Sequence, residues 1–311
     1  MSSQLSFFPD AHRAQLSWSV SRDKRLKTCL RRYYYQHFAS KGGASAEASD
    51  EQRELYMLKW LRNRFMWVGE IVHEAVEHAL DTMRSREQVD VDALCRRSVQ
   101  RMRLQYSESL HRVYKERPRL ACGLFEHEYQ QSITRTQWRE QRDRMERCIR
   151  NFFKLSLFEE ICSTPSYRWL ALEETSSFIV DDATVVVKPD FAWRDTDGLV
   201  HLVDWKTGIA RPEDEKLQLA VYAILGQREW GARPEEIVGH VAYLEPGHVV
   251  RIDLNVHDLE WAENAIRESL ATMRDVHRTE TATDRFAMER FPMTQDLERC
   301  TMCNFKRHCA R

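Results

Sequence analysis

The spacing of hydrophobic residues changes along the chain and predicts a helical part followed by a part rich in strands. Between about residues 51 and 161, apolar residues recur every three or four positions, which is the period of a helix with one buried face. The segment 67–80 is the clearest case. Its apolar side consists of Val68, Val72, Val76 and Leu80.

From Arg168 to Leu254, short β-rich runs replace the helical pattern. Strands are expected over 168–180, 183–193, 199–205, 237–245 and 248–254. A helix over 215–227 separates the third strand from the fourth, and an amphipathic helix over 257–277 follows the last strand. Strands interrupted by a helix predict an α/β core, preceded here by a large helical region.

Two carboxylates and a lysine lie close together in this predicted core. Turn-forming residues 195–198 join the second and third runs into a hairpin, with Asp190 on one strand and Asp204 on the other. Side chains alternate along a strand, so Lys206 shares a face with Asp204. Such a pair of acids can bind a hard divalent cation, and a lysine beside it can orient a water or offset developing charge. Alternatively, the acids end strands and the lysine is solvated, because a single D-x-K tripeptide often arises by chance.

The residues around these acids resemble the two metal-binding motifs of the PD-(D/E)xK nuclease superfamily, in its RecB-like branch. Pro189 and Asp190 match the first motif, and the run DWKTG from Asp204 to Gly208 matches the second. The chain departs from many relatives in one respect. They carry Gly shortly before the first Asp, where this chain has Lys188 and Pro189.

Two further pairs extend the resemblance. Gln218 and Tyr222 lie four residues apart on one face of the predicted helix, as in the Q-x3-Y motif of the branch. Gly69 and His73 resemble its G-x3-H motif. In that family the His is a further metal ligand, and an imidazole suits Mn²⁺ better than Mg²⁺.

The resemblance implies a fold, an activity and a set of site residues. The implied fold is a restriction-endonuclease-like core, in which helices flank a mixed central sheet. The implied catalytic residues are Asp190, Asp204, Lys206, Gln218 and Tyr222, with His73, Asp190 and Asp204 as ligands of Mg²⁺ or Mn²⁺. Glu173 and Glu174 lie on the first expected strand, where relatives add an acidic residue near the metals. Because neighbouring strand residues face opposite ways, only one of the two can face inward.

Four of the eight cysteines form a second candidate site. Cys300, Cys303 and Cys309 crowd the end of the sequence, and Cys29 lies near its beginning. Disulfides are disfavoured because no secretory signal is recognisable at the N-terminus. Zinc remains an alternative, with His308 as a further possible ligand. The four cysteines also resemble those of AddB-like and CRISPR-adaptation nucleases of the same branch, which implies a 4Fe–4S cluster that ties the two ends together.

These placements predict four parts in the chain. Residues 1–40 are an N-terminal segment that contributes Cys29, and 41–165 are a mostly helical region that carries His73. Residues 166–290 are the nuclease core, and 291–311 contain the other three cluster cysteines. The polar, Gly-bearing stretch 41–52 is expected to be a linker or loop.

Charge and composition limit the kind of partner. Lys and Arg number 47 against 48 Asp and Glu, so any binding of a polyanion must be local. No apolar run approaches the roughly 20 residues of a membrane span, which predicts a cytoplasmic protein without a membrane partner. The segment around Cys29 mixes Arg and Lys with Tyr33, Tyr34 and Tyr35. Basic residues interleaved with aromatic ones are typical of proteins that bind single-stranded nucleic acid.

The sequence therefore predicts a divalent-metal-dependent DNA nuclease. We expect an exonuclease or end-processing enzyme for single-stranded DNA or unpaired ends, in DNA repair, recombination, CRISPR adaptation or phage defence. A helicase or an integrase-type protein is a possible partner. The alternative is a non-catalytic DNA-binding or scaffold subunit that keeps the fold and the cluster. The presence of every expected active-site residue type favours the enzyme.

Overall fold

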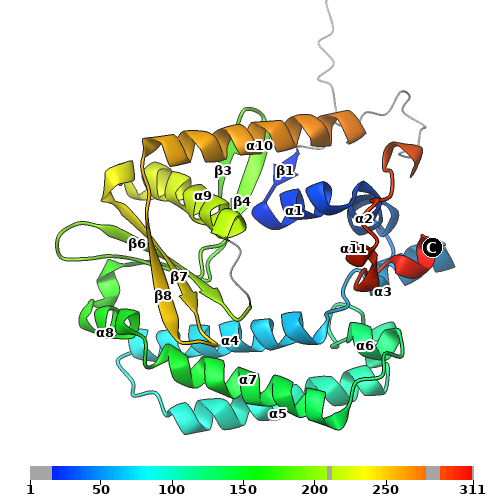
Figure 1. Cartoon of the computed structure of the whole chain (residues 1–311), viewed down its shortest axis with the longest axis horizontal. Helices are drawn as coiled ribbons and strands as arrows, with labels where there is room; N and C mark the ends of the chain where they lie inside the picture. The colour runs from blue at the N-terminus through cyan, green and yellow to red at the C-terminus, as the bar shows by residue number, and fades with distance from the viewer. Residues whose placement is uncertain (1–15, 209–211, 278–287, 310–311) are drawn as a thin grey trace, which may run out of the picture.

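A mixed five-stranded sheet forms the centre of the protein, whose computed structural model describes residues 16–208, 212–277 and 288–309 (Figure 1). In spatial order, its strands are β2 (Trp169–Leu172), β5 (Phe191–Arg194), β6 (Val200–Lys206), β7 (Ile237–Tyr243) and β8 (His248–Asp253). β6 and β7 are parallel, and the other neighbours are antiparallel. The helix α9 (Pro212–Trp230) connects β6 to β7, because parallel strands need a crossover.

Helices cover both faces of this sheet, as predicted. On one face lie α9 and α10 (Val256–His277), and on the other lie α4 (Arg64–Arg84), α7 (Arg135–Phe152) and α8 (Ser156–Ser163), with α5 (Val91–Leu110) beside α4 and α7 (Figure 1). Alternation along β6 serves both layers: Leu202 packs into the core on the α9 side and Val203 into the core on the α4 side. None of the helices in the described ranges is long and apolar enough to cross a membrane.

The two strands expected over 168–180 and 183–193 are each broken in the structure, which corrects the prediction. Their other halves, β3 (Ser176–Val180) and β4 (Ala183–Val187), belong to a separate sheet with β1 (Ser17–Trp18). Pro189 explains one break, because it has no N–H for the strand ladder. Glu173, with a φ of 53°, marks the other, and its N–H donates to the Asp190 carbonyl over 3.1 Å. Glu173, Glu174 and Asp190 therefore lie where a long hairpin bends between two sheets, and not within strands.

The two described ends of the chain pack against each other. The first helical elements are α1 (Val20–Thr28), α2 (Leu30–Tyr34), the π-helix η1 (Tyr35–Ala39) and α3 (Asp50–Leu58). They meet the C-terminal elements α11 (Glu298–Thr301) and η6 (Lys306–His308) (Figure 1). Tyr35 donates to the carbonyl of His308 over 2.9 Å, and Asn304 donates to the carbonyl of Leu61 over 2.9 Å. The remaining helical elements are η2 (Val113–Lys115), α6 (Phe125–Glu128), η3 (Ser166–Arg168), η4 (Pro234–Glu236) and η5 (Met288–Arg290).

The structure corrects two expectations about the first 52 residues. Tyr33 and Tyr35 are buried, so their rings cannot stack on bases as the sequence suggested. Tyr33 instead accepts a hydrogen bond from Arg22 over 3.0 Å. The stretch 41–52 is also not wholly a loop, because α3 begins at Asp50 with a capping box formed by Ser49 and Gln52.

Candidate active site

The end of β6 brings a carboxylate and an ammonium group into contact. Asp204 and Lys206 occupy alternate positions of the strand, and Lys206 Nζ lies 2.6 Å from Asp204 Oδ2. Trp205 between them faces the other layer, where its ring packs edge-on against Phe152 with ring centroids 5.3 Å apart. The strand therefore presents its polar pair to the α9 side while Trp205 anchors it on the other side.

Two side chains of α9 hold this pair. The Gln218 side chain accepts a hydrogen bond from Lys206 over 3.0 Å and donates to Asp204 Oδ1 over 2.7 Å. It also donates to the hydroxyl of Tyr222, one turn later, over 2.7 Å. Tyr222 in turn donates to the Lys188 carbonyl over 2.9 Å, directly before Pro189. The Q-x3-Y pair thus links the polar end of β6 to the break between β4 and β5.

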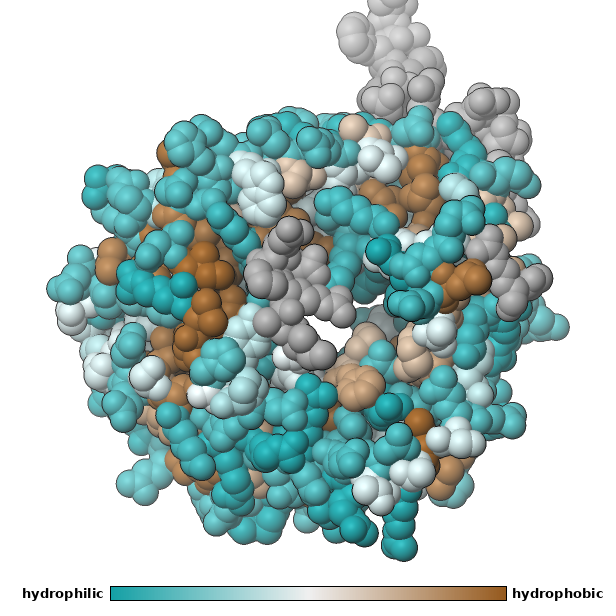
Figure 2. Space-filling model, in the orientation of Figure 1, coloured by the Kyte–Doolittle hydropathy of each residue, from teal (hydrophilic) through white to brown (hydrophobic). Residues whose placement is uncertain are grey.

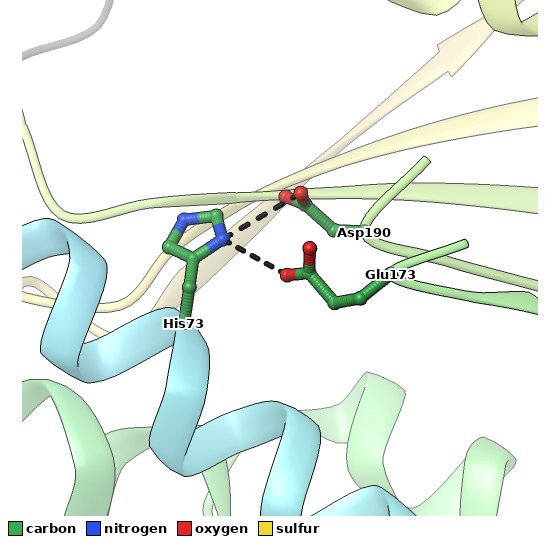
Figure 3. A group of neighbouring side chains, drawn as sticks. All are labelled: His73, Glu173 and Asp190. Atoms are coloured by element: carbon green, nitrogen blue, oxygen red, sulfur yellow. Dashed lines mark hydrogen bonds and ion pairs between the residues drawn. The ribbon is translucent and has the colours of Figure 1, made fainter. Parts of the chain in front are cut away.

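A second group of side chains converges from α4 and from the two sides of the hairpin bend (Figure 3). His73 of α4 places Nδ1 3.3 Å from Glu173 Oε1 and 3.5 Å from Asp190 Oδ1. These three residues are the one set of at least three His, Cys, Asp or Glu side chains, among the described residues, whose donor atoms lie within 4.8 Å of one another. Nitrogen and carboxylate oxygen ligands in this number suit a transition-series divalent ion such as Mn²⁺.

Backbone groups of Trp205 orient this second group. The Trp205 N–H donates to Asp190 Oδ2 over 2.7 Å, and its carbonyl lies 3.0 Å from His73 Nε2. A carbonyl can only accept, so Nε2 carries the proton and donates to it. Nδ1 is then the nitrogen turned toward the two carboxylates, an arrangement that fixes the tautomer of metal-binding histidines.

Gly69 allows α4 to approach the end of β6. A Cβ atom at this position would lie 3.2 Å from Thr207 Oγ1, which is closer than most carbon contacts allow. Gly69 precedes His73 by about one helical turn, so the close approach also brings the imidazole to the sheet. The G-x3-H spacing has a packing reason as well as a chemical one.

The site concentrates negative charge in a buried place. Burial and the neighbouring Asp190 carboxylate raise the pKa of Asp204, although Lys206 acts in the opposite direction. Burial lowers the pKa of His73, but Asp190 and Glu173 outweigh it, and the pKa is raised well above 6.5. Burial and the nearby acids also raise the pKa of Tyr222, which keeps its hydroxyl as a donor. Lys188, 2.5 Å from Glu173, adds one positive charge. Without a metal, His73, Lys188 and Lys206 thus offset the three carboxylates, and a divalent cation bound by His73 would replace the proton on Nδ1.

The four cysteines singled out in the sequence line one cavity at the junction of the chain ends. Its volume is about 310 Å³, and Arg32, Arg299 and Lys306 also line it. In the described residues, no three cysteine sulfurs lie within 4.8 Å of one another. Burial and the other thiols raise the pKa of Cys303 and Cys309. His308 is directed elsewhere, with Nε2 3.2 Å from Glu54. Of the remaining cysteines, Cys95, Cys122 and Cys148 are buried and Cys162 is exposed.

The structure thus places the predicted residues in two neighbouring groups and adds one. His73 and Asp190 meet each other, whereas Asp204 contacts Lys206 and Gln218. Glu173 joins the first group, while Glu174 is exposed. The sequence offered two adjacent acids without a signal to choose between them, because the choice depends on the backbone bend at Glu173.

Comparison with protein families agrees with this geometry. The family model of the PD-(D/E)XK nuclease superfamily matches residues 17–310 of the chain. Comparison with individual curated proteins gave no match. The family match spans almost the whole sequence, including both groups of site residues. The chain belongs to the PD-(D/E)XK nuclease superfamily, whose members are divalent-metal-dependent hydrolases of nucleic-acid phosphodiester bonds.

Proposed function

We propose that the protein is a Mg²⁺- or Mn²⁺-dependent deoxyribonuclease that acts on single-stranded DNA or unpaired ends, as an exonuclease or end-processing enzyme. This proposal rests on one observation: the donor atoms of His73, Glu173 and Asp190 lie close together, beside the Asp204–Lys206 ion pair. A decayed site in a scaffold subunit would have no reason to keep these groups buried and hydrogen-bonded to one another.

His73, Asp190 and Asp204, together with Glu173, would hold the metal. A bound divalent cation supplies polarisation of a phosphoryl oxygen and a lowered pKa for a bound water. The chain contributes the orientation of the ligands: Trp205 holds His73 and Asp190 through its backbone, and Gln218 holds Asp204.

Lys206 is the residue that we assign to the reacting phosphate. Its ammonium group is fixed by Asp204 at 2.6 Å and by Gln218 at 3.0 Å. A fixed positive charge stabilises the negative charge that develops on phosphate oxygens, without reorganisation during the reaction. We assign Gln218 and Tyr222 to positioning, because they contact Asp204, Lys206 and the backbone at Lys188.

The cysteine cavity supports a 4Fe–4S cluster rather than zinc. Four sulfurs bound to one zinc ion at about 2.3 Å would be drawn to about 3.8 Å from one another. The sulfurs of Cys29, Cys300, Cys303 and Cys309 are more widely spread, around a space of about 310 Å³. A cluster held by these thiolates carries net negative charge, which Arg32, Arg299 and Lys306 can offset.

A groove beside Lys206 supports the proposal that the substrate is a nucleic-acid strand. It has a volume of about 820 Å³, and Lys24, Lys27, Lys206 and Arg299 line it together with the acids Asp23 and Glu215. Figure 2 shows the surface hollowed at its centre, between the layers that contain α1 and α4 in Figure 1. Binding through phosphate contacts weakens as the salt concentration rises, because counterions are released.

The test is cleavage of end-labelled DNA by the full chain in Mg²⁺, Mn²⁺ or EDTA. We expect single strands to be cut only with a divalent metal, and expect Asp190→Asn and Asp204→Asn to abolish cleavage. Unchanged cleavage by Asp204→Asn would contradict the assignment, and binding without cleavage in either metal would favour the scaffold alternative. Faster cutting of blunt duplex would contradict the single-strand preference. Equal cutting of linear and circular strands would show that no free end is needed.

A further inference from the structure

An exposed aromatic ring lies at the start of the helix that carries His73. Phe65, in the first turn of α4, leaves 45 % of its surface exposed. Residues four apart on a helix lie one above the other, so Phe65, Gly69 and His73 follow one face of α4. At 1.5 Å per residue, Phe65 lies about 12 Å along the helix from His73. The ring is therefore on the active-site side of α4.

Two guanidinium groups lie over this ring, and the part of the ring that they leave uncovered is exposed. The guanidinium carbon of Arg64 lies 4.5 Å from the ring centroid, and that of Arg144 lies 5.8 Å from it. Each cation forms an ion pair with a carboxylate: Arg64 Nη1 lies 3.4 Å from Glu126, and Arg144 Nε lies 2.8 Å from Glu245. The aromatic ring and the two positive charges thus form a preorganised group on the protein surface.

The same group is linked directly to the end of β6. Arg144 donates a hydrogen bond to the carbonyl of Thr207, the residue after Lys206. Thr207 is also the residue against which Gly69 packs. Arg144 and Phe65 therefore lie next to the end of the strand that carries Lys206.

We propose that Phe65, with Arg64 and Arg144, binds an unpaired nucleobase of the strand whose phosphodiester lies at Lys206. This inference rests on the proposed function and adds how the enzyme selects single-stranded substrate. An aromatic ring stacks on any base, and a guanidinium group beside it can contact both the base and a phosphate. A base inside a duplex is covered on both faces by its neighbours, so away from duplex ends only an unpaired base can stack here. Phe65 takes the role that the buried Tyr33 and Tyr35 cannot take.

The test measures DNA binding and not cleavage. A fluorescent single-stranded oligonucleotide is titrated with the full chain in EDTA, and one abasic residue is moved along its length. We expect the affinity of the wild-type protein to fall when the abasic residue occupies one or two adjacent positions. We expect Phe65→Leu to weaken binding of the intact oligonucleotide about fivefold or more, the low end of the range for one stacked base, and to lose the response to abasic residues.

Two further variants separate stacking from a general effect on the protein. Phe65→Trp keeps an aromatic ring and restores both the affinity and the abasic response. Tyr167→Leu removes an aromatic side chain that is 81 % exposed elsewhere on the surface, and leaves both unchanged. Thermal melting by circular dichroism checks that every variant is folded.

The outcomes distinguish this inference from the proposed function. If the wild-type protein responds to abasic residues and Phe65→Leu responds in the same way, the stacking role is wrong and the proposed substrate stands. If the wild-type protein binds duplex more tightly and shows no abasic response, both the stacking role and the single-strand preference are wrong.

Discussion

Gln218 donates a hydrogen bond to Asp204 Oδ1 over 2.7 Å. The same amide accepts one from Lys206, so a single side chain of α9 sets the positions of the carboxylate and the ammonium group at the end of β6. Its third hydrogen bond, to Tyr222, uses the remaining N–H of the amide. These three hydrogen bonds determine the orientation of the amide.

We expect Gln218→Leu to reduce the rate of DNA cleavage about 100-fold, the scale of effect that a small misplacement of reacting groups produces. The affinity for Mn²⁺ should fall much less than the rate, because Gln218 contacts only Asp204 among the four assigned ligands and does not bond to His73, Glu173 or Asp190. Single-turnover cleavage and calorimetric titration with Mn²⁺ measure the two properties separately.

The matched control for this variant is Gln227→Leu, on an exposed part of the same helix. It should leave both the rate and the affinity for Mn²⁺ unchanged. A Gln218→Leu protein that cleaves at the wild-type rate would show that Asp204 and Lys206 need no positioning from α9.

Much of the sheet and its helices could be predicted from the sequence, because their periods are clear. The alternation of β6 and the helical spacing of α4 and α9 placed Asp204, Lys206, His73 and Gln218 on the correct elements. Glu173 could not be assigned in this way. Its side chain reaches the site because the hairpin bends there with a positive φ, and Pro189 on the partner strand is the only local signal of that bend.

The aromatic residues show a second limit of sequence reasoning. The Arg-rich and Tyr-rich segment after residue 20 has the composition of a nucleic-acid binding surface, yet Tyr33 is buried in the core that contains α9 and α10, and Tyr35 is buried against the C-terminal residues. Phe65 belongs to an ordinary helix start, and its two guanidinium neighbours include Arg144, which is distant in the sequence. Composition identifies the residue types, but long-range packing decides which of them remain exposed.

The cysteine cavity leads to a spectroscopic prediction. Anaerobically purified protein should be brown and contain about four irons per chain, the content of one 4Fe–4S cluster. Cys303→Ser should remove the colour and lower the melting temperature by several degrees, because the proposed cluster would join Cys29, between α1 and α2, to the C-terminal residues. Cys162→Ser, at an exposed cysteine outside the cavity, is the control and should change neither. Zinc instead of iron by elemental analysis would contradict the cluster but not the nuclease.

A buried histidine pair leads to a prediction about pH. His240 on β7 lies 2.9 Å from His201, whose ring stacks on Trp193. Burial lowers the pKa of His240 to about 3, and His201 and Arg251 act in the same direction. In the unfolded chain the pKa is about 6.5, so below that pH the unfolded state binds a proton that the folded state does not. The contribution of His240 to stability is therefore lost as the pH falls from about 6.5 toward 3.

We expect the free energy of unfolding of the wild-type protein to fall by about 2 kcal/mol between pH 7 and pH 5 relative to that of His240→Gln, which has no titrating group. Urea unfolding at the two pH values measures this difference. His257→Gln replaces an exposed histidine and should show no such change. A constant difference between wild type and His240→Gln would mean that His240 has the same pKa in the folded and the unfolded chain, which would contradict the prediction.

The last prediction concerns Glu173, the acid that the bend of the hairpin brings to His73. Glu173→Gln keeps the size of the side chain but removes its negative charge, so the affinity for Mn²⁺ should fall at least about tenfold, as expected for a change in or next to a metal's ligands. Its neighbour provides the control, because Glu174 is exposed and lies outside the group of donors. Glu174→Gln should bind Mn²⁺ as the wild-type protein does. Calorimetric titration of both variants decides the point: equal affinities would show that Glu173 only pairs with Lys188, 2.5 Å away, and that the metal is bound without it.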